Sequence, residues 1–232
     1  MNLSLNLNKI GIVGAGAMGS GIAQIASQAG HKVVVFDLNQ SALDTSANKL
    51  SKVMTRLIEK GKINASESSA IQEGIYRTTD ITQFNGCGVV IEAVIEDLNV
   101  KQTVFSQIEN IVSSDCVIAT NTSSLSITTI AAGCKNPERV VGLHFFNPAP
   151  LMPLVEVIPA LQTREGLIKD LVELMTKWGK SPVIAKDTPG FIVNRVARPY
   201  YGEAMRILDE GLADVSTIDD AMKSLGFRMG PF

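Results

Sequence analysis

Short apolar runs and amphipathic helical stretches follow one another along most of the chain. Apolar runs at 10–13, 33–36, 89–94 and 116–119 have the length of strands, and the stretches between them carry apolar residues at helical spacing. Strands that alternate with helices are typical of a mostly parallel sheet covered by helices. The pattern therefore predicts an α/β domain of the Rossmann type, with further strands at 140–144, 154–158 and 183–185.

The pattern changes at Asp187-Thr-Pro-Gly190, which interrupts any regular element. After this segment, apolar residues recur only at helical spacing, and Pro199 predicts a kink in the first of these helices. One apolar stripe is expected along that helix, made of Val193, Val196, Ala197, Tyr200, Ala204 and Leu208. We therefore expect two domains, a Rossmann-type domain over 1–188 and the start of an all-helical domain over 189–232.

The first predicted strand leads directly into a glycine-rich loop that opens a helix. Gly14 permits a tight turn, Gly16 lets the backbone approach a pyrophosphate, and Gly19 lets the helix pack closely on the strand. The N–H groups at the start of the helix, together with the helix dipole, favour a bound anion. We predict that a dinucleotide binds this loop, which consists of Gly14, Ala15, Gly16, Ala17, Met18 and Gly19.

Asp37 ends the second predicted strand, at a distance from Gly19 where a carboxylate accepts hydrogen bonds from an adenosine ribose. The same carboxylate would repel a 2′-phosphate. The predicted cofactor is therefore NAD rather than NADP.

Polar side chains also follow the next two strands. Glu96 lies just after the strand at 89–94, and Asn121 and Ser123 follow the strand at 116–119. Ligands of open parallel sheets bind beyond the carboxyl ends of the strands, so these side chains are expected on the same edge as the glycine loop. Serine and asparagine after a strand are also ordinary helix caps, and that alternative stays open for both residues.

A histidine and a glutamate lie on the two sides of a proline-containing turn. Strand alternation places Glu156 on the same face as its apolar neighbours, and a buried carboxylate needs a partner. His144 lies across the turn and can supply that partner. A histidine held by a carboxylate at one ring nitrogen has a fixed tautomer, which suits a general base for an alcohol. A purely structural pair is the alternative.

Lysines and arginines recur on one face of the long helix that follows Asp37. They are spaced three and four apart and comprise Lys49, Lys52, Arg56 and Lys60. They form either a solvated basic face or a docking surface for a polyanionic ligand.

Composition narrows the class of protein. The 232 residues are 45% hydrophobic and 19% charged, which is typical of a folded domain, and a formal net charge of −2 gives no electrostatic case for nucleic acid or an anionic membrane. No apolar run has the length of a membrane span, and the amino-terminal segment lacks the pattern of a signal peptide. The cysteines are odd in number and widely spaced, which predicts reduced thiols in the cytoplasm and no metal site.

Taken together, these motifs resemble the 3-hydroxyacyl-CoA dehydrogenases over essentially the whole chain. The matching segments are 14–19, 96–101, 121–124, 144–148, 154–157 and 187–195. Within that family, 135–139 and 195–201 are most similar to bacterial 3-hydroxyadipyl-CoA and 3-hydroxybutyryl-CoA dehydrogenases, which implies a role in fatty acid β-oxidation or phenylacetate catabolism.

The resemblance implies a role for each matched residue. His144 would take the proton of the 3-hydroxyl, Glu156 would orient the imidazole, and Ser123 and Asn194 would hold the hydroxyl and thioester ends of the substrate. Ser123 would also lie against the nicotinamide. The remaining matches are cofactor contacts at Glu96, Lys101 and Asn121, and contacts with coenzyme A at Lys52 and Arg56.

Arg198 lies four residues after Asn194, on the same face of the predicted helix. It could therefore reach a distal carboxylate on the acyl chain, such as an adipyl tail presents. The alternative is a surface arginine that lies along Tyr201.

Two other functions stay open at this point, an NAD-dependent dehydrogenase of a free hydroxy acid and a non-catalytic NAD-binding fragment. The second domain of the family continues beyond the segment at 229–232 with further helices. We therefore expect an incomplete helical domain here, and a homodimer when that domain is complete.

Overall fold

The computed structural model describes residues 7–232 and divides the chain into two compact units, Met1–Thr188 and Pro189–Phe232. Residues 1–6 fall outside this description, and most of the segment considered for a signal peptide falls there. Among the described residues, no helix is both long enough and apolar enough to cross a bilayer.

Unit 1 is built on one sheet of eight strands in the order β3-β2-β1-β4-β5-β6-β7-β8. Every neighbouring pair is parallel except β6 with β7. This architecture confirms the predicted Rossmann-type fold. The strands are β1 Lys9–Val13, β2 Lys32–Phe36, β3 Ile75–Thr78, β4 Val89–Glu92, β5 Val117–Thr120, β6 Val140–Phe145, β7 Leu154–Pro159 and β8 Ser181–Ile184.

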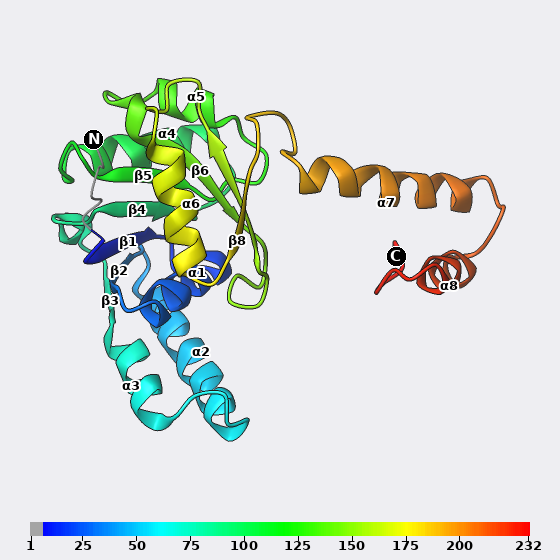
Figure 1. The fold of residues 1–232 in the computed structure, drawn as a ribbon, viewed down its shortest axis with the longest axis horizontal. Coiled ribbons are helices and arrows are strands. Elements are labelled where there is room, and N and C mark those ends of the chain that lie inside the picture. The colour runs from blue at the N-terminus through cyan, green and yellow to red at the C-terminus, as the bar shows by residue number, and fades with distance from the viewer. Residues whose placement is uncertain (1–6) are drawn as a thin grey trace. The chain divides into compact units, whose positions relative to one another are not determined.

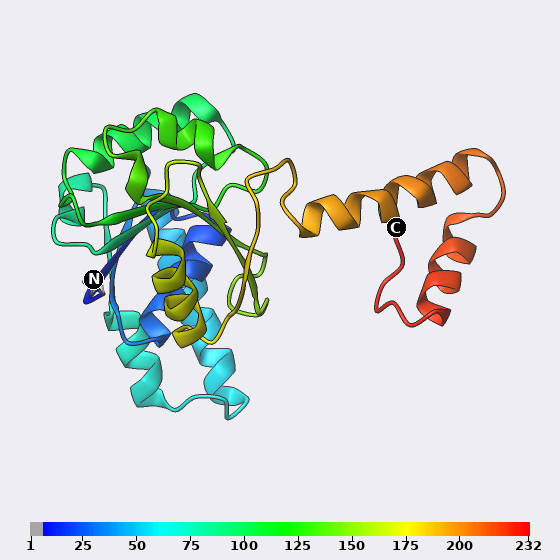
Figure 2. The ribbon, with the colours of Figure 1, turned by 45° about the horizontal axis from the view of Figure 1, so that its top comes forward.

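Helices cover both faces of the sheet (Figures 1 and 2). Helices α1 and α6 pack on one face, α4 and α5 lie on the other, and α2 forms a hairpin with α3. The bounds are α1 Ala17–Gln28, α2 Gln40–Glu59, α3 Ala65–Glu73, α4 Leu98–Glu109, α5 Ile127–Ala132 and α6 Leu167–Lys177, with short 3₁₀ turns at Ile81–Phe84 and Pro137–Arg139.

The central strands are buried on both sides, which explains their continuous apolar runs. In β1, Ile10 and Ile12 contribute to the core cluster that also contains the apolar residues of α1 and α6. Gly11 lies between them and faces the other way, where an added Cβ would come within 2.8 Å of the Phe84 ring. The glycine therefore admits the aromatic ring against the sheet.

Two elements of unit 1 were missing from the sequence expectations. Strand β3 is a short edge strand in which Tyr76 is exposed, so it lacks the apolar run of a central strand. Helix α5 has only six residues, too few to show helical periodicity.

Unit 2 contains α7 Val193–Asp209 and α8 Val215–Ser224. Helix α7 is continuous across Pro199. The expected apolar stripe is covered unevenly, because Ala204 is buried whereas Val196 is 70% exposed. Tyr200 is covered differently, by stacking on Phe227 with 5.2 Å between ring centroids.

Candidate active site

The glycine loop joins the end of β1 to the start of α1. Gly14 has a φ of +100°, and a Cβ there would lie 2.7 Å from the carbonyl oxygen of Ala93, so both the turn and the neighbouring chain require glycine. Gly16 is the N-cap of α1, and no side chain caps the helix at this end. A Cβ on Gly16 would meet no atom within 4 Å. No side chain therefore crowds or caps the Gly16 end of α1, which leaves room for an anion at the start of the helix.

Asp37 follows β2 and holds the glycine loop directly. Its Oδ2 accepts the N–H of Ala15 at 2.8 Å, and its Oδ1 accepts the N–H of Asn39 at 2.9 Å. Each carboxylate oxygen can accept more than one bond, so the group retains acceptor capacity for the two hydroxyls of a ribose. The predicted cofactor residue thus also shapes the loop that would receive the pyrophosphate.

Glu96 organises the loop that carries Ser123. Its Oε1 accepts the hydroxyl of Thr122 at 2.5 Å, the N–H of Ser123 at 2.8 Å and the N–H of Ser124 at 3.1 Å. Burial acts to raise the pKa of Glu96, but these bonds and the nearby Lys101 outweigh it and bring the pKa down to about 2. The carboxylate is therefore ionised and acts as a cap for residues 122–124.

Lys101 lies behind this loop and is almost completely buried. Its Nζ donates to Glu92 Oε1 at 2.7 Å and lies 3.4 Å from Glu96 Oε2. The described contacts of Lys101 are thus with carboxylates that support the site. The cofactor contact implied for it stays a prediction.

Asn121 connects two neighbouring strands at the edge where the site lies. Its N–H donates to the carbonyl of Glu92 at 2.8 Å, and its side-chain oxygen accepts the N–H of Phe145 at 2.8 Å. Because Phe145 directly follows His144, Asn121 fixes the histidine-bearing strand against the loop of Ser123. A helix cap, the alternative for Asn121, is not what these contacts show.

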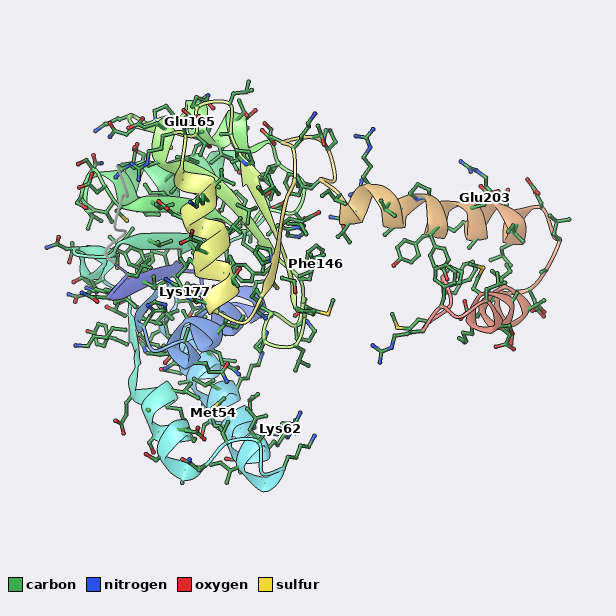
Figure 3. All side chains as sticks on the ribbon, in the orientation of Figure 1. Met54, Lys62, Phe146, Glu165, Lys177 and Glu203 are labelled. Carbon is green, nitrogen blue, oxygen red and sulfur yellow. The ribbon has the colours of Figure 1, made fainter. Side chains whose placement is uncertain are left out.

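His144 and Glu156 occupy directly opposed positions of the antiparallel pair β6 and β7. The Nδ1 of His144 lies 2.7 Å from Oε2 of Glu156, which is fully buried, and the histidine is only 5% exposed. In the neutral ring, Nδ1 carries the proton toward the carboxylate, and the basic lone pair is on Nε2. Phe146, which is labelled in Figure 3, limits the space around the imidazole of His144. The centroids of the two rings are 4.4 Å apart.

The glycine loop and His144 lie at the same edge of the sheet. Val13 of β1 pairs with Glu92, Glu92 pairs with Thr120, and Thr120 pairs with Gly142 in β6. All of these strands are parallel, so their carboxyl ends share one edge. The register therefore brings together the glycine loop, the loop of Ser123 and the histidine–glutamate pair.

A cavity of about 660 Å³ lies beside the glycine loop. The turn after β6 lines one side of it, and the glycine loop and helices α1 and α2 supply the rest. Its lining includes Gly16, Ser20, Lys49, Val53, Pro148 and Leu151. The cavity therefore extends from the glycine loop to the basic helix α2.

The lysines and arginines on one face of α2 do not all line this cavity. Lys49 is part of the lining, whereas Lys52 and Arg56 are exposed on the neighbouring surface and are not among the lining residues. The two residues proposed for coenzyme A are thus at the margin of the cavity, and Lys49 is nearer to its interior.

Asn194 and Arg198 belong to unit 2, one turn apart on α7. Asn194 is half-buried and Arg198 is exposed. Their contacts with substrate stay predictions.

Glu92 is the site residue that the sequence reasoning missed. It is completely buried at the end of β4 and contacts both Lys101 and Thr120. A carboxylate within an apolar strand was the signal that singled out Glu156, and the same signal was present at Glu92.

Two family models match the chain. One, described as the NAD binding domain of 3-hydroxyacyl-CoA dehydrogenase, matches residues 9–188, and one described as the C-terminal domain of the same enzyme matches residues 190–232. The chain therefore belongs to the 3-hydroxyacyl-CoA dehydrogenase family. The resemblance inferred from the motifs and the NAD class of cofactor are both confirmed.

Particular relatives have closely similar sequences and folds. The chain is 44% identical over 230 residues to 3-hydroxyadipyl-CoA dehydrogenase of Escherichia coli (strain K12), covering 99% of this chain and 48% of the relative. It is 40% identical over 224 residues to 3-hydroxybutyryl-CoA dehydrogenase of Clostridioides difficile, covering 96% and 80%. The crystal structure of 3-hydroxybutyryl-CoA dehydrogenase from E. coli K12 matches with a TM-score of 0.95 and 44% identity, covering 98% and 48%. The chain thus spans about half the length of the E. coli relative.

Proposed function

We propose that the chain is an NAD-dependent dehydrogenase that oxidises a (3S)-3-hydroxyacyl-CoA to the 3-oxoacyl-CoA. The observation that carries the proposal is the buried pair of His144 and Glu156, with 2.7 Å between Nδ1 and Oε2, on the sheet edge that also carries the glycine loop. The names of the relatives from E. coli and C. difficile support the same class of reaction.

The residues around the glycine loop fit NAD. The uncapped start of α1 at Gly16 would receive the pyrophosphate, and Asp37 would accept the ribose hydroxyls. When bound, NAD supplies the ring that accepts a hydride from the substrate. Ser123 and Asn121, held in place by Glu96 and by β6, would line the nicotinamide end.

In the oxidation, Nε2 of His144 would take the proton of the 3-hydroxyl group. Glu156 keeps the other ring nitrogen protonated and stabilises the imidazolium that forms. Ser123 would donate to the oxygen of the reacting carbon. In the reverse direction the same imidazolium would return the proton to that oxygen.

The remainder of the substrate would contact α2 and α7. The cavity beside the glycine loop would take the pantetheine arm, with Lys49 at its wall and Lys52 and Arg56 near the phosphates. Asn194 would hold the thioester end, and Arg198 a distal carboxylate if the acyl chain has one. The role of Arg198 is tested by the ratio of kcat/KM for 3-hydroxyadipyl-CoA to that for 3-hydroxyhexanoyl-CoA, measured in the parent and in Arg198→Ala. An unchanged ratio would show that Arg198 does not bind a distal carboxylate.

All three cysteines are free thiols, and Cys87 and Cys116 are buried. Burial raises the pKa of Cys87 to about 11 and that of Cys116 to about 12, so both remain protonated and unreactive. These thiols support a reducing compartment, and we place the protein in the cytoplasm.

Turnover of acetoacetyl-CoA with NADH, followed by the loss of NADH absorbance, tests the proposal. Free acetoacetate serves as the parallel substrate, and NADH binding is measured separately by fluorescence. We expect turnover of the CoA ester and none of the free acid. Turnover of the free acid alone would identify a hydroxy-acid dehydrogenase, and NADH binding without any turnover would identify a non-catalytic protein.

Asp37 is predicted to set the cofactor preference. NADH should bind at least about tenfold more tightly than NADPH, because a 2′-phosphate would meet an uncompensated carboxylate. Asp37→Ala should reduce the preference for NADH over NADPH, because the repelling carboxylate is removed. It should also weaken NADH binding, since it releases the N–H of Ala15 in the glycine loop. The exposed Asp44, on α2, provides the control Asp44→Ala. Equal affinities of the parent for the two nucleotides would contradict the prediction.

A further inference from the structure

Glu92 is a fully buried carboxylate at the carboxyl end of β4, in the middle of the sheet. Both oxygens are engaged by donors. Oε1 accepts the ammonium of Lys101 and the N–H of Val94, each at 2.7 Å, and Oε2 accepts the hydroxyl of Thr120 at 2.7 Å. Burying a carboxylate is costly unless such partners are present. These donors therefore offset the cost of burying Glu92.

The contacts of Glu92 lead to the loop of Ser123 by two routes. Along the first, Lys101 lies between Glu92 and Glu96, and Glu96 accepts the N–H groups of Ser123 and Ser124. Along the second, the hydroxyl of Thr120 donates to Glu92 and accepts the N–H of Thr122 at 3.1 Å. The single carboxylate thus supports the loop at its start and, through one lysine, at its centre.

The ammonium of Lys101 is not shared equally between the two carboxylates of this cluster. Two carboxylates share one ammonium, and the ammonium is 0.7 Å closer to Glu92 than to Glu96 (2.7 Å against 3.4 Å). Lys101 thus bonds to Glu92 and approaches Glu96 only at Oε2, and Oε1 of Glu96 is left to its five donors in the loop.

We infer that Glu92 is a positioning residue for the reaction, which sets the loop that presents Ser123 through Lys101 and Thr120. The inference rests on the proposed function, because Ser123 is the residue proposed to hold the reacting oxygen. Glu92 itself would touch neither substrate nor cofactor.

The variant Glu92→Gln keeps the shape of the side chain and removes its charge. An amide N–H₂ would then face either Thr120 or Lys101, both of which donate to the carboxylate in the parent. Lys101 would move toward Glu96, the remaining carboxylate, and compete with the loop donors. We expect kcat to fall by about tenfold or more, because small displacements of an aligned group are costly, while KM and NADH affinity stay within about threefold.

Glu109→Gln is the matched control. Glu109 is a comparably buried carboxylate in α4 that pairs with the buried Arg139 at 3.2 Å, and its contacts are with residues 135, 136 and 139 rather than with the loop. Both variants remove one charge from a buried ion pair. If Glu92 acts only through stability, the two variants should lose kcat in proportion to their loss of melting temperature. If Glu92 positions Ser123, only Glu92→Gln should lower kcat.

Amide hydrogen exchange provides a readout that does not depend on turnover. The N–H groups of Ser123 and Ser124 should exchange at least about tenfold faster in Glu92→Gln, since opening of the loop exposes them. The N–H groups of Ile127 and Thr128 serve as an internal reference, because they donate to Asp187. If the chain turns over no acyl-CoA, the proposed function fails, and this measurement still tests the positioning.

The double variant Glu92→Gln/Lys101→Met distinguishes a role of Glu92 in positioning the loop of Ser123 from the cost of leaving the Lys101 ammonium unpaired. It removes both members of the ion pair, so stability should recover relative to either single variant. Positioning predicts that kcat stays low, because the carboxylate that accepts the hydroxyl of Thr120, and through it supports Thr122, is still missing. Recovery of kcat together with stability, or unchanged exchange at Ser123 in Glu92→Gln, would overturn the inference.

Discussion

At the scale of single residues, His144 differs sharply from the other histidine of the chain. His31 lies between the carbonyl of Leu7 and the indole N–H of Trp178, at 2.6 and 2.9 Å. Its Nε2 accepts from the indole, so its Nδ1 must donate to the carbonyl. His31 is thus held by two neutral partners, whereas His144 faces a carboxylate that can stabilise a positive ring.

His144→Ala should lower turnover by about a hundredfold or more while NADH affinity stays nearly intact, because only proton transfer is removed. Glu156→Gln should also slow turnover, since the imidazolium loses its counter-charge. The measurements are steady-state kcat and NADH affinity. His31→Asn is the control and should keep the parental kcat. Parental turnover in either site variant would contradict the assignment.

From the lowered pKa of Glu96 we predict that the free energy of unfolding falls as the solution is acidified. The pKa of Glu96 is lowered in the folded chain from 4.5 to about 2, so as pH falls the unfolded chain takes up this proton first. Its stabilising contribution is complete above about pH 4.5 and is lost as the pH falls toward 2. Glu96→Gln should therefore flatten the fall in the free energy of unfolding across this range, measured by urea titration.

The exposed Glu59, on α2, supplies the comparison for that experiment. Glu59→Gln should leave the acid dependence as it is in the parent. An equal slope in the parent and in Glu96→Gln would show that the bonds from residues 122–124 do not favour the ionised form of Glu96.

At the scale of elements, the sequence predicted the central strands well because glycines and long apolar runs mark them. The run before Gly14 and the run before Asp37 correspond to β1 and β2. The edge strand β3 could not be found in this way, since an exposed strand carries mixed residues such as Tyr76 and Arg77. Elements that are buried on two sides are thus far easier to predict than those at the margin.

Within the site, local spacing could identify candidates but not their partners. The pair of His144 and Glu156 was predictable because only one short turn separates them. The partners of Glu96 in the loop at 122–124 and the Phe145 partner of Asn121 were not, because they lie 24 to 28 residues away on other elements. Lys101 shows the same limit, since its burial between two carboxylates depends on how α4 packs beside β4.

The turn between β6 and β7 depends on a single lysine at the start of the neighbouring strand. Lys180 is buried, and its Nζ donates to the carbonyls of Ala149 and Met152 at 2.6 and 2.9 Å. Burial lowers the pKa of Lys180. Because Pro148 and Leu151 of this turn line the cavity, the ammonium holds one wall of the proposed site for coenzyme A.

Lys180→Met should raise KM for the acyl-CoA by about tenfold with little change in kcat, because the wall loosens while the proton-transfer pair stays in place. Steady-state kinetics at saturating NADH provide the measurement. Lys177→Met, at the exposed end of α6 (Figure 3), is the control and should retain the parental KM. A change in kcat alone would contradict the role of the turn in substrate binding.

At the scale of the whole molecule, the two units differ in how much they bury. Unit 1 contains an extensive core on both faces of its sheet, whereas the buried side chains of unit 2 are Phe191, Ala204 and Ile218. Large apolar side chains of unit 2 are exposed instead, among them Val196, Met205, Leu212, Leu225 and Met229 at 64–76%. Apolar surface of this extent commonly marks an interface.

We therefore predict that the chain associates with itself through unit 2, in a concentration-dependent manner. Sedimentation velocity across a dilution series measures this association. Met205→Glu should shift the equilibrium toward monomer, because it places a charge in the apolar surface. The neighbouring Arg206→Glu, on an exposed polar position, is the control. A monomer at every concentration would show that the exposed residues need no partner.

The register between β6 and β7 and the turn that joins these strands have different tasks in the site. His144 faces Glu156 because of the register between the strands, and a slip of one residue along β7 would turn Glu156 to the opposite face. The side chains of the turn between these strands, by contrast, take no part in that register. Substitutions at residues 147–152 can therefore alter one wall of the proposed coenzyme A site while the pairing of His144 with Glu156 is kept.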